Sequence, residues 1–331
     1  MNPTIYQLIA LDVPPLLCAI FAAIACSILG SYLVLRRQSL LGDAIAHSVL
    51  PGIVVAFLIT SSRSMLPIFI GAAVAGVCSA FLIEVVRRLG KVDESASMGV
   101  VFSTFFALGI LTMEQAAARN VDLDADCLLH GQLETIFWYP PRDFASLLSW
   151  ATLAAIPSEV YASAATALLV IGFVALFWKE LALSSFDPAL SSALGFRSDL
   201  IHHALMVLLA CAVVASFKAV GSILVIALLV CPAATARLYT DRLLNQLLLS
   251  SLFSIIACIA GYICGAFLPL WLGFNHSVNV AGMITVVAGL MLGIAIITAP
   301  RYGLMARRFK SKRNLQRLSI SPTLNSYRQN S

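Results

Sequence analysis

Long apolar runs are the feature that most restricts how this chain can fold. They recur from Leu11 to Ala299, and each approaches the length of about 20 residues that a helix needs to cross a bilayer. Of the 331 residues, 60% are hydrophobic and 11% are charged, whereas soluble domains carry about a quarter charged residues. Backbone polar groups within lipid must be hydrogen-bonded inside the chain. The sequence therefore predicts an all-α, polytopic membrane helical bundle.

Nine membrane spans can be drawn through these runs. We place them at 13–35, 38–60, 65–86, 95–113, 157–177, 199–217, 219–238, 244–266 and 280–299. The alternative is eight spans, if the tight turn at 217–219 merges two of the predicted helices. Within the spans, the G-x-x-x-G of Gly261 and Gly265 predicts close helix packing.

Basic residues orient the spans. Most of those before the tail fall between alternate spans, so by the positive-inside rule they mark the cytoplasmic face. The groups are Arg36 and Arg37; Arg87, Arg88 and Lys91; Lys179 and Arg197; Arg237 and Arg242. We expect a multi-pass protein of the bacterial inner membrane, with its N-terminus outside and its C-terminus in the cytoplasm.

A basic tail, 301–331, follows the membrane domain of 1–300. It contains eight of the 21 basic residues and no acid, so the remainder of the chain has 13 basic against 16 acidic residues. Its polar composition predicts disorder, and its charge predicts contact with anionic membrane lipid. We expect no nucleic-acid partner, because the tail contains no folded module.

One long segment, 114–156, joins the fourth and fifth spans on the outer side. Its acidic first part, which includes Asp122, Asp124 and Asp126, could concentrate cations or contact a basic partner. An ordinary polar loop is an equal alternative. The run Phe144–Ile156 is too short to span and predicts an interfacial or re-entrant helix.

An acid and a histidine stand four residues apart near the start of the second span. This spacing places Asp43 and His47 on one face of a helix, one turn from each other. Ionisable groups within a span usually face a partner, a cavity or a pathway. A carboxylate with an imidazole suits Mn²⁺, Fe²⁺ or Zn²⁺, but two ligands are too few for a closed site. The pair is therefore either an incomplete site on a metal pathway or a structural hydrogen-bonded pair.

A short helix is predicted between the fifth and sixth spans, at 186–196. Asp187 is the expected N-cap, with Pro188 at the first helical position and Gly195 after the last turn. This helix is either a simple connection or a docking site for a cytoplasmic partner. Two polar clusters lie close to this end of the spans: Glu84 with Arg87 and Arg88 as a helix-end ion-pair cluster, and His202 with His203, expected at a solvated surface.

Four proline and glycine positions are candidate gate or packing elements. They are Pro51, Gly52, Gly221 and Pro232. A proline inside a helix removes a hydrogen bond and bends the helix, but transmembrane prolines are also tolerated without a functional role. The residues themselves do not decide between these readings.

Three sequence blocks resemble the manganese/zinc/iron-type ABC importer permease family. They are Gly42-Asp43-Ala44 with His47 and Pro51-Gly52, Asp187-Pro188-Ala189 with Leu194-Gly195, and the stretch from Lys218 through Gly221 to Pro232-Ala233-Ala234. The resemblance covers about 13–300. It implies a type II importer fold, a homo- or heterodimer of permease subunits, an extracytoplasmic metal-binding protein, and two cytoplasmic ATPase subunits.

The resemblance also implies roles for residues. Asp43 and His47 would be a transit site for metal in the pore, and Asp187, Pro188, Ala189, Leu194 and Gly195 would couple the permease to the ATPase. The stretch from Asn275 to Gly282 lacks the acid that the family often has there, so we assign it no metal role. The longer 137–156 segment is similar to that of a subgroup linked to manganese and iron.

The chain is not expected to be an enzyme or to hold a permanent cofactor. It contains neither the G-x-x-x-x-G-K-[ST] loop of ATPases nor the H-E-x-x-H of metalloproteases. A proton-coupled secondary metal carrier is the alternative function, because such a carrier needs no ATPase partner. Metal binding requires the neutral imidazole of His47, so mild acid should weaken uptake.

Overall fold

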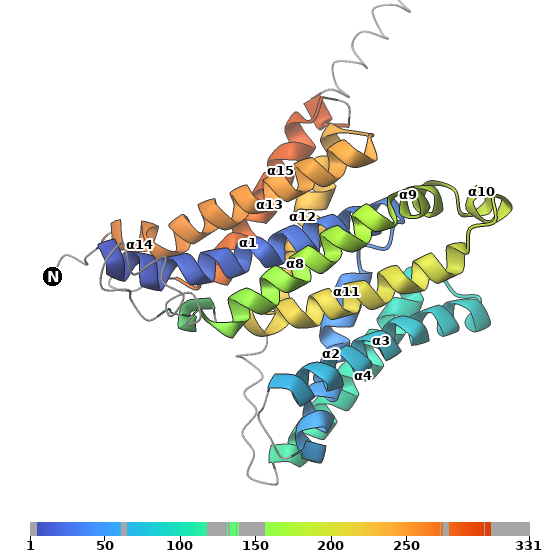
Figure 1. Cartoon of the computed structure of the whole chain (residues 1–331), viewed down its shortest axis with the longest axis horizontal. Helices are drawn as coiled ribbons and strands as arrows, with labels where there is room; N and C mark the ends of the chain where they lie inside the picture. The colour runs from blue at the N-terminus through green and yellow to red at the C-terminus, as the bar shows by residue number, and fades with distance from the viewer. Residues whose placement is uncertain are drawn as a thin grey trace, which may run out of the picture.

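The computed structural model describes residues 5–60, 65–117, 131, 133–136, 138, 156–271, 273, 278–300 and 302–305. Every regular element within these ranges is a helix (Figure 1). The helices are α1 (Ile5–Leu35), α2 (Leu41–Thr60), α3 (Met65–Gly90), α4 (Glu94–Ala117), η1 (Leu133–Thr135), α8 (Ser158–Leu176), α9 (Trp178–Phe186), α10 (Pro188–Ala193), α11 (Ser198–Val220), α12 (Ser222–Tyr239), α13 (Leu243–Ala266), α14 (Leu268–Trp271) and α15 (Val280–Thr298).

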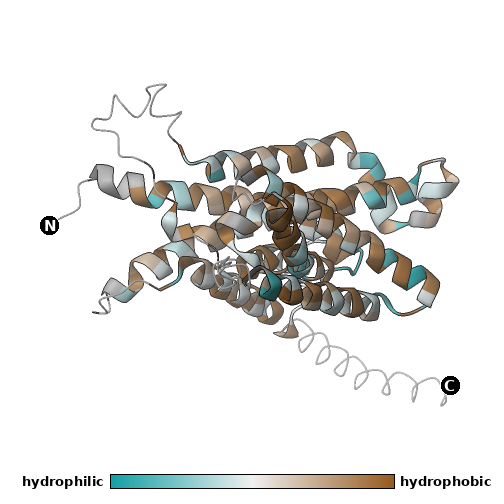
Figure 2. Ribbon diagram, turned by 90° about the horizontal axis from the view of Figure 1, so that it is seen from below, coloured by the Kyte–Doolittle hydropathy of each residue, from teal (hydrophilic) through white to brown (hydrophobic). Residues whose placement is uncertain are grey.

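The predicted polytopic helical bundle is confirmed. Nine helices in the described part of the chain are long and apolar enough to cross a membrane. Their ends lie close to the predicted ones; the fourth span, for example, was placed at 95–113 and α4 is Glu94–Ala117. Figure 2 shows hydrophobic residues along the helices, with hydrophilic residues prominent at the end that carries α9 and α10.

The alternative of eight spans is wrong, because α11 and α12 are separate helices. The break lies at Gly221, not at 217–219 as the sequence suggested. Gly221 has φ of +82°, in the left-handed region that side chains other than glycine rarely adopt. A Cβ at Gly131 would collide with the backbone of Val220 and Gly221. The turn therefore depends on glycine at both positions.

The helices form two groups that meet along α11. In the larger group, α1 packs against α8, α11, α12 and α13, while α15 covers α12 and α13. The smaller group consists of α2, α3 and α4, with α2 packed on both of the others (Figure 1). Because α11 contacts both α2 and α3, and α12 also contacts α2, these two helices connect the groups.

Small residues set how closely the helices pack. A Cβ on Gly261 would meet the backbone of Ile284, and one on Gly265 would touch Val280. The predicted G-x-x-x-G therefore lies at the contact of α13 with α15. Gly52 and Gly71 face each other in the same way between α2 and α3, each against the other's carbonyl group.

Polar side chains on α13 hydrogen-bond to α1 inside the bundle. Ser250 Oγ donates to the Ser27 carbonyl at 2.9 Å, and Gln246 Nε2 donates to the Ser31 carbonyl at 3.4 Å. Ser254 Oγ lies 3.3 Å from Ser27 Oγ. These residues repeat every fourth position on α13, so one face of the helix makes all the bonds.

Several predictions fall outside the described residues. They concern the interfacial helix at 144–155, the acidic segment 118–130, the stretch 274–277 and nearly all of the basic tail. The division into 1–300 and 301–331 stays a prediction for the same reason.

Candidate functional site

Asp43 and His47 form the pair that their spacing predicts. Asp43 lies in the first turn of α2, where the positive end of the helix dipole favours a carboxylate. His47 Nε2 lies 3.3 Å from Asp43 Oδ1. The side chain of Asp43 is 42% exposed and that of His47 is 23% exposed. Both groups are therefore accessible at a surface of this chain and are not sealed in its core.

Two phenylalanines of α4 hold the imidazole of His47. The ring centroid of Phe102 lies 5.2 Å from that of His47, and the centroid of Phe106 lies 5.9 Å from it, both in edge-on geometry. Phe102 and Phe106 stack on each other at 5.9 Å. Such contacts restrict the rotation of the ring. The sequence reasoning missed this support, although two phenylalanines four residues apart on one helix face gave a signal for it.

One copy of the chain supplies an incomplete set of metal ligands. Within the described ranges, no group of three or more His, Cys, Asp or Glu side chains could hold a metal ion. Asp43 and His47 provide one oxygen and one nitrogen donor, whereas Zn²⁺ takes four ligands in closed protein sites. The 3.3 Å contact fits either a weak metal site or a structural pair of the two side chains.

Close packing fixes the helix that carries this pair. Gly42 lies against the side chain of Leu229 on α12, and Ala44, Ile45 and Ala46 are buried. Gly52 lies one turn beyond the pair, at the contact with Gly71 on α3. Since α2 is held on both sides, its start cannot shift without moving α12 or α3.

The predicted prolines lie inside continuous helices. Pro51 is in α2, and Pro232 is buried in α12. Both helices continue without interruption past their proline.

The predicted docking helix is present as α10, and it is shorter than the range 186–196. Asp187 caps it by accepting a hydrogen bond from the Leu190 amide at 3.0 Å, and Pro188 occupies its first turn. Gly195 follows with φ of +85°, the conformation that commonly ends a helix. Sequence reasoning missed α9, which precedes α10 directly, because Trp178–Phe186 is too short and too polar to be a span.

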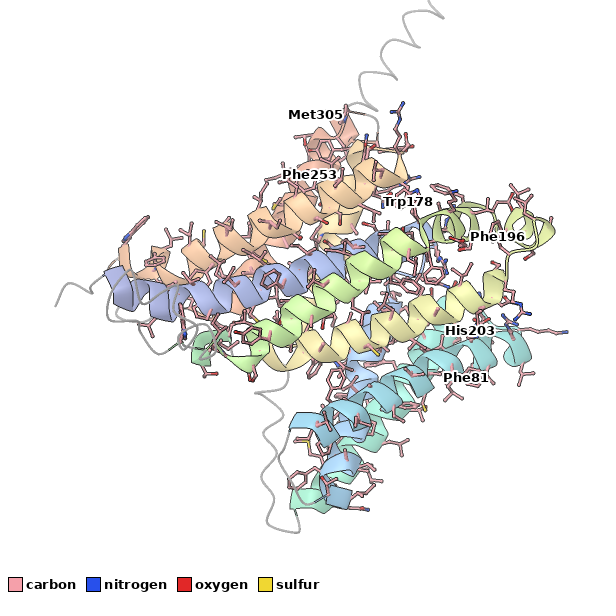
Figure 3. All side chains as sticks on the ribbon, in the orientation of Figure 1. Phe81, Trp178, Phe196, His203, Phe253 and Met305 are labelled. Carbon is pink, nitrogen blue, oxygen red and sulfur yellow. The ribbon has the colours of Figure 1, made fainter. Side chains whose placement is uncertain are left out.

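The tip formed by α9 and α10 presents apolar side chains to its surroundings. Figure 3 shows Phe196 beside α10 at the end of the molecule. Phe186 is 55% exposed and Leu194 is 61% exposed. Large apolar groups at the end of a helical hairpin are typical of a contact with another protein.

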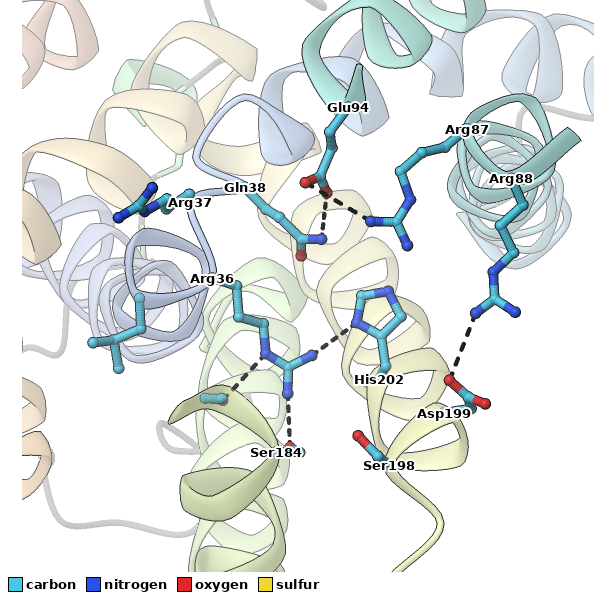
Figure 4. Close-up of a pocket in the computed structure, with 12 residues that line it drawn as sticks. Arg36, Arg37, Gln38, Arg87, Arg88, Glu94, Ser184, Ser198, Asp199 and His202 are labelled. Carbon is cyan, nitrogen blue, oxygen red and sulfur yellow. Dashed lines mark hydrogen bonds and ion pairs between the residues drawn. The ribbon is translucent and has the colours of Figure 1, made fainter. Parts of the chain in front are cut away.

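Polar residues near this tip form a network that corrects one prediction. His202 was expected at a solvated surface, but its Nδ1 lies 2.8 Å from Nη1 of Arg36 (Figure 4). Arg36 also donates to Ser185 Oγ at 3.1 Å and to Ser184 Oγ at 3.0 Å. Arg36 therefore links the turn before α2 to both α9 and α11. A single sequence gives no signal for a contact between residues so far apart in the chain.

The predicted ion-pair cluster at the end of α3 is present. Glu84 Oε1 accepts a hydrogen bond from Arg87 Nη2 at 2.7 Å and another from Arg88. Arg88 also lies 3.6 Å from Asp199 on α11. This cluster joins α3 to the start of α11.

The sequence and the structure are both similar to known proteins. A model of the ABC 3 transport family matches residues 11–156 and 142–298. The manganese transport system membrane protein MntD of Bacillus subtilis (strain 168) is 34% identical over 292 residues, which are 88% of this chain and 93% of that protein. The zinc transport system membrane protein TroD of Treponema pallidum (strain Nichols) is 35% identical over 291 residues, which are 88% and 75% of the two chains. The solved structure of PsaBC from Streptococcus pneumoniae in complex with Fab matches with a TM-score of 0.70 and 27% identity, covering 94% of this chain and 96% of that one.

Proposed function

This chain belongs to the ABC 3 transport family of metal importer permeases, and we propose that it is the membrane-spanning subunit of an ATP-driven importer for Mn²⁺, Fe²⁺ or Zn²⁺. The observation that carries the proposal is the Asp43–His47 pair, 3.3 Å apart at the start of α2 and open to the surface of the chain. Similar proteins named for manganese and zinc transport support the choice of a divalent transition metal.

The pair acts as a transit site for the metal. A neutral imidazole and a carboxylate bind these ions, and a weak, incomplete site lets the ion leave again. A second permease subunit, identical or related, supplies further ligands across the pore. Phe102 and Phe106 keep the imidazole aimed at the pathway, so the ion meets a fixed donor.

The tip formed by α9 and α10 receives one of two cytoplasmic ATPase subunits. Asp187 and Gly195 fix the ends of α10, and Leu194 offers an apolar contact. Motion at this tip reaches α2 through α11 and Arg36. An extracytoplasmic metal-binding protein delivers the ion at the opposite face, where the N-terminus lies, and the C-terminus is cytoplasmic.

Uptake of radioactive metal tests the transit site. In cells that depend on this importer, metal uptake should fall at least about tenfold when His47→Ala removes a ligand. Asp43→Asn should reduce uptake more than Asp43→Glu. His203→Ala is the matched control, because it removes an imidazole that is not part of the pair. Uptake by His47→Ala equal to that of the wild type would contradict the assignment, and full uptake by Asp43→Asn would favour a structural pair.

Purification separates the ATP-driven importer from a proton-coupled carrier. The importer should co-purify with an ATPase subunit, and its uptake should require ATP. Uptake that persists without ATP and stops when the proton gradient is collapsed would identify a secondary carrier.

A further inference from the structure

A cavity of about 350 Å³ opens where the turn between α1 and α2 meets α3, α4, α9 and α11. Figure 4 shows the residues around it. Four arginines and two carboxylates line this cavity, which we call the arginine-lined cavity. They are Arg36, Arg37, Arg87 and Arg88, and Glu94 and Asp199. The lining residues lie at helix ends, which is the level of lipid headgroups in a membrane protein.

Arg36 lacks an acidic partner in this cavity. Its three hydrogen bonds go to Ser184, Ser185 and His202, which are all neutral acceptors. No carboxylate of the described residues lies within 4.0 Å of it; the ion pairs near the cavity involve only Arg87 and Arg88. Burial lowers the pKa of Arg36 to about 10, so the guanidinium remains charged at neutral pH. A partly buried charge without a counter-ion is costly.

His202 cannot supply or remove charge here. A guanidinium only donates hydrogen bonds, so Nδ1 of His202 accepts from Arg36 and carries no proton. The imidazole is therefore neutral, with its proton on Nε2. Since Arg36 uses three of its five N–H groups, two remain for a further acceptor.

The other arginines differ in their charge balance. Arg87 and Arg88 share Glu84, and they also approach Glu94 and Asp199 at 4.0 and 3.6 Å. Arg37 is exposed and, within the described part of the chain, makes no ion pair. The cavity thus has two uncompensated cations side by side in the sequence.

The acidic residues outside the described ranges all fall between 118 and 155 in the sequence, after α4 ends at Ala117. Glu94, which lines the cavity, is at the other end of α4, a helix of 24 residues. A helix of that length is about 36 Å long.

We propose that the arginine-lined cavity binds the phosphate group of an anionic phospholipid headgroup, with Arg36 as its direct charge partner and the exposed Arg37, which points away from Arg36 in Figure 4, adding positive charge at the rim. A phosphate offers pairs of acceptor oxygens that can accept two N–H bonds from a planar guanidinium group. Basic pockets between transmembrane helices on the cytoplasmic side recognise such headgroups. The bound lipid would hold the turn before α2 against α9 and α11. Free phosphate has the same chemistry, so the experiment must separate the two sources.

The test is lipid binding by the full-length chain, purified with its partner subunits in a neutral detergent. The thermal unfolding midpoint is measured during titration with short-chain phosphatidylglycerol, phosphatidylcholine or sodium phosphate at constant ionic strength. Phosphatidylglycerol should raise the midpoint saturably, and phosphatidylcholine should not. An equal effect of sodium phosphate would assign the cavity to a free anion and overturn the lipid assignment.

Two variants connect the effect to the cavity. Arg36→Gln should weaken phosphatidylglycerol binding at least tenfold, and Arg37→Gln should weaken it several-fold while leaving the bonds of Arg36 to α9 and α11 in place. Arg197→Gln, which removes an exposed cation at the same end, is the matched control. Unchanged binding in both cavity variants would overturn the proposal.

A partner's carboxylate is the competing source of counter-charge. If Arg36→Gln abolishes co-purification of the ATPase and leaves phosphatidylglycerol binding intact, the cavity belongs to that protein contact and the proposal is wrong. Lipid binding is measured without transport, so a failure of this proposal leaves the proposed metal uptake untouched, and the reverse also holds.

Discussion

At the scale of single residues, the candidate pathway depends on the orientation of one imidazole. His47 has Asp43 on its own helix and two phenylalanines on α4 as neighbours. The carboxylate supplies charge, whereas the rings supply only geometry. Changes to these neighbours should therefore have different effects on transport.

Phe106→Ala should reduce metal uptake without removing a ligand. The loss of one aromatic contact, about 0.5–1.5 kcal/mol, corresponds to about a two- to tenfold higher metal concentration for half-maximal uptake. The control is Phe81→Ala on α3, since Phe81 is 60% exposed and does not contact His47. Concentration-dependent uptake, corrected for the amount of protein in the membrane, gives the measurement. Equal half-maximal concentrations for Phe106→Ala and the wild type would show that Phe106 does not contribute to the site.

At the scale of elements, α10 and the contact of α13 with α15 are each defined by a few residues. The cap of α10 comes from Asp187, and the close approach of α13 and α15 depends on Gly261. Both features follow from short sequence patterns. Both can therefore be changed by single substitutions.

Asp187→Ala should loosen α10 and weaken its coupling to the ATPase. Loss of an N-cap costs about 1 kcal/mol, so the affinity of the ATPase subunit should fall about fivefold if docking needs the ordered helix. Asp187→Asn is the matched control, because asparagine caps helices equally well. Binding of the ATPase subunit to the permease in detergent, measured for both variants, distinguishes the cap from the charge. A loss with Asp187→Asn as well would show that the carboxylate itself makes the contact.

Gly261→Ala should lower the thermal unfolding midpoint of the permease. The added Cβ would overlap the backbone of Ile284, so α13 and α15 must separate; overpacking of this kind costs about 1–3 kcal/mol. Gly293→Ala on α15 is the control, since nothing lies within 4 Å of its added Cβ. Thermal denaturation in detergent should show a lower midpoint for the first variant and an unchanged or higher one for the second. An unchanged midpoint for Gly261→Ala would mean that the two helices can move apart without cost.

At the scale of the whole molecule, the nine helices of the described residues that are long and apolar enough to cross a membrane predict that the two ends of the chain lie on opposite sides of it. We predict that a reporter fused to the N-terminus is active only outside the cytoplasm and that one fused to the C-terminus is active only inside. A reporter fused after Gly90, where α3 ends, should behave like the C-terminal one. Matching activity of the two terminal fusions would require an even number of spans and would reverse the assignment of at least one end.

The sequence predicted the elements better than their contacts. Spans such as 95–113 were found because hydropathy is a local property of the sequence and a helix that crosses a bilayer must be apolar along most of its length. The cap at Asp187 and the pair of Asp43 and His47 were likewise found, because the residues involved are at most four positions apart. The contact of Arg36 with His202 joins positions 166 apart, and no local pattern encodes it. The exact turn at Gly221 was missed because a break between two apolar helices leaves almost no hydropathy signal.

The division of the bundle into two groups of helices has a thermodynamic consequence. Asp43, His47 and their phenylalanine neighbours belong to the group of α2, α3 and α4, whereas α10 follows α9 in the other group. Any free energy that connects metal occupancy to docking at α10 must therefore be stored where α2 and α3 meet α11 and α12. Linkage is reciprocal, so an ion on the pair must change the affinity of the docked partner by the same factor that docking changes the affinity for the ion. In the proposed importer, a metal ion on the pair and an ATPase subunit docked at α10 would therefore each change the affinity for the other.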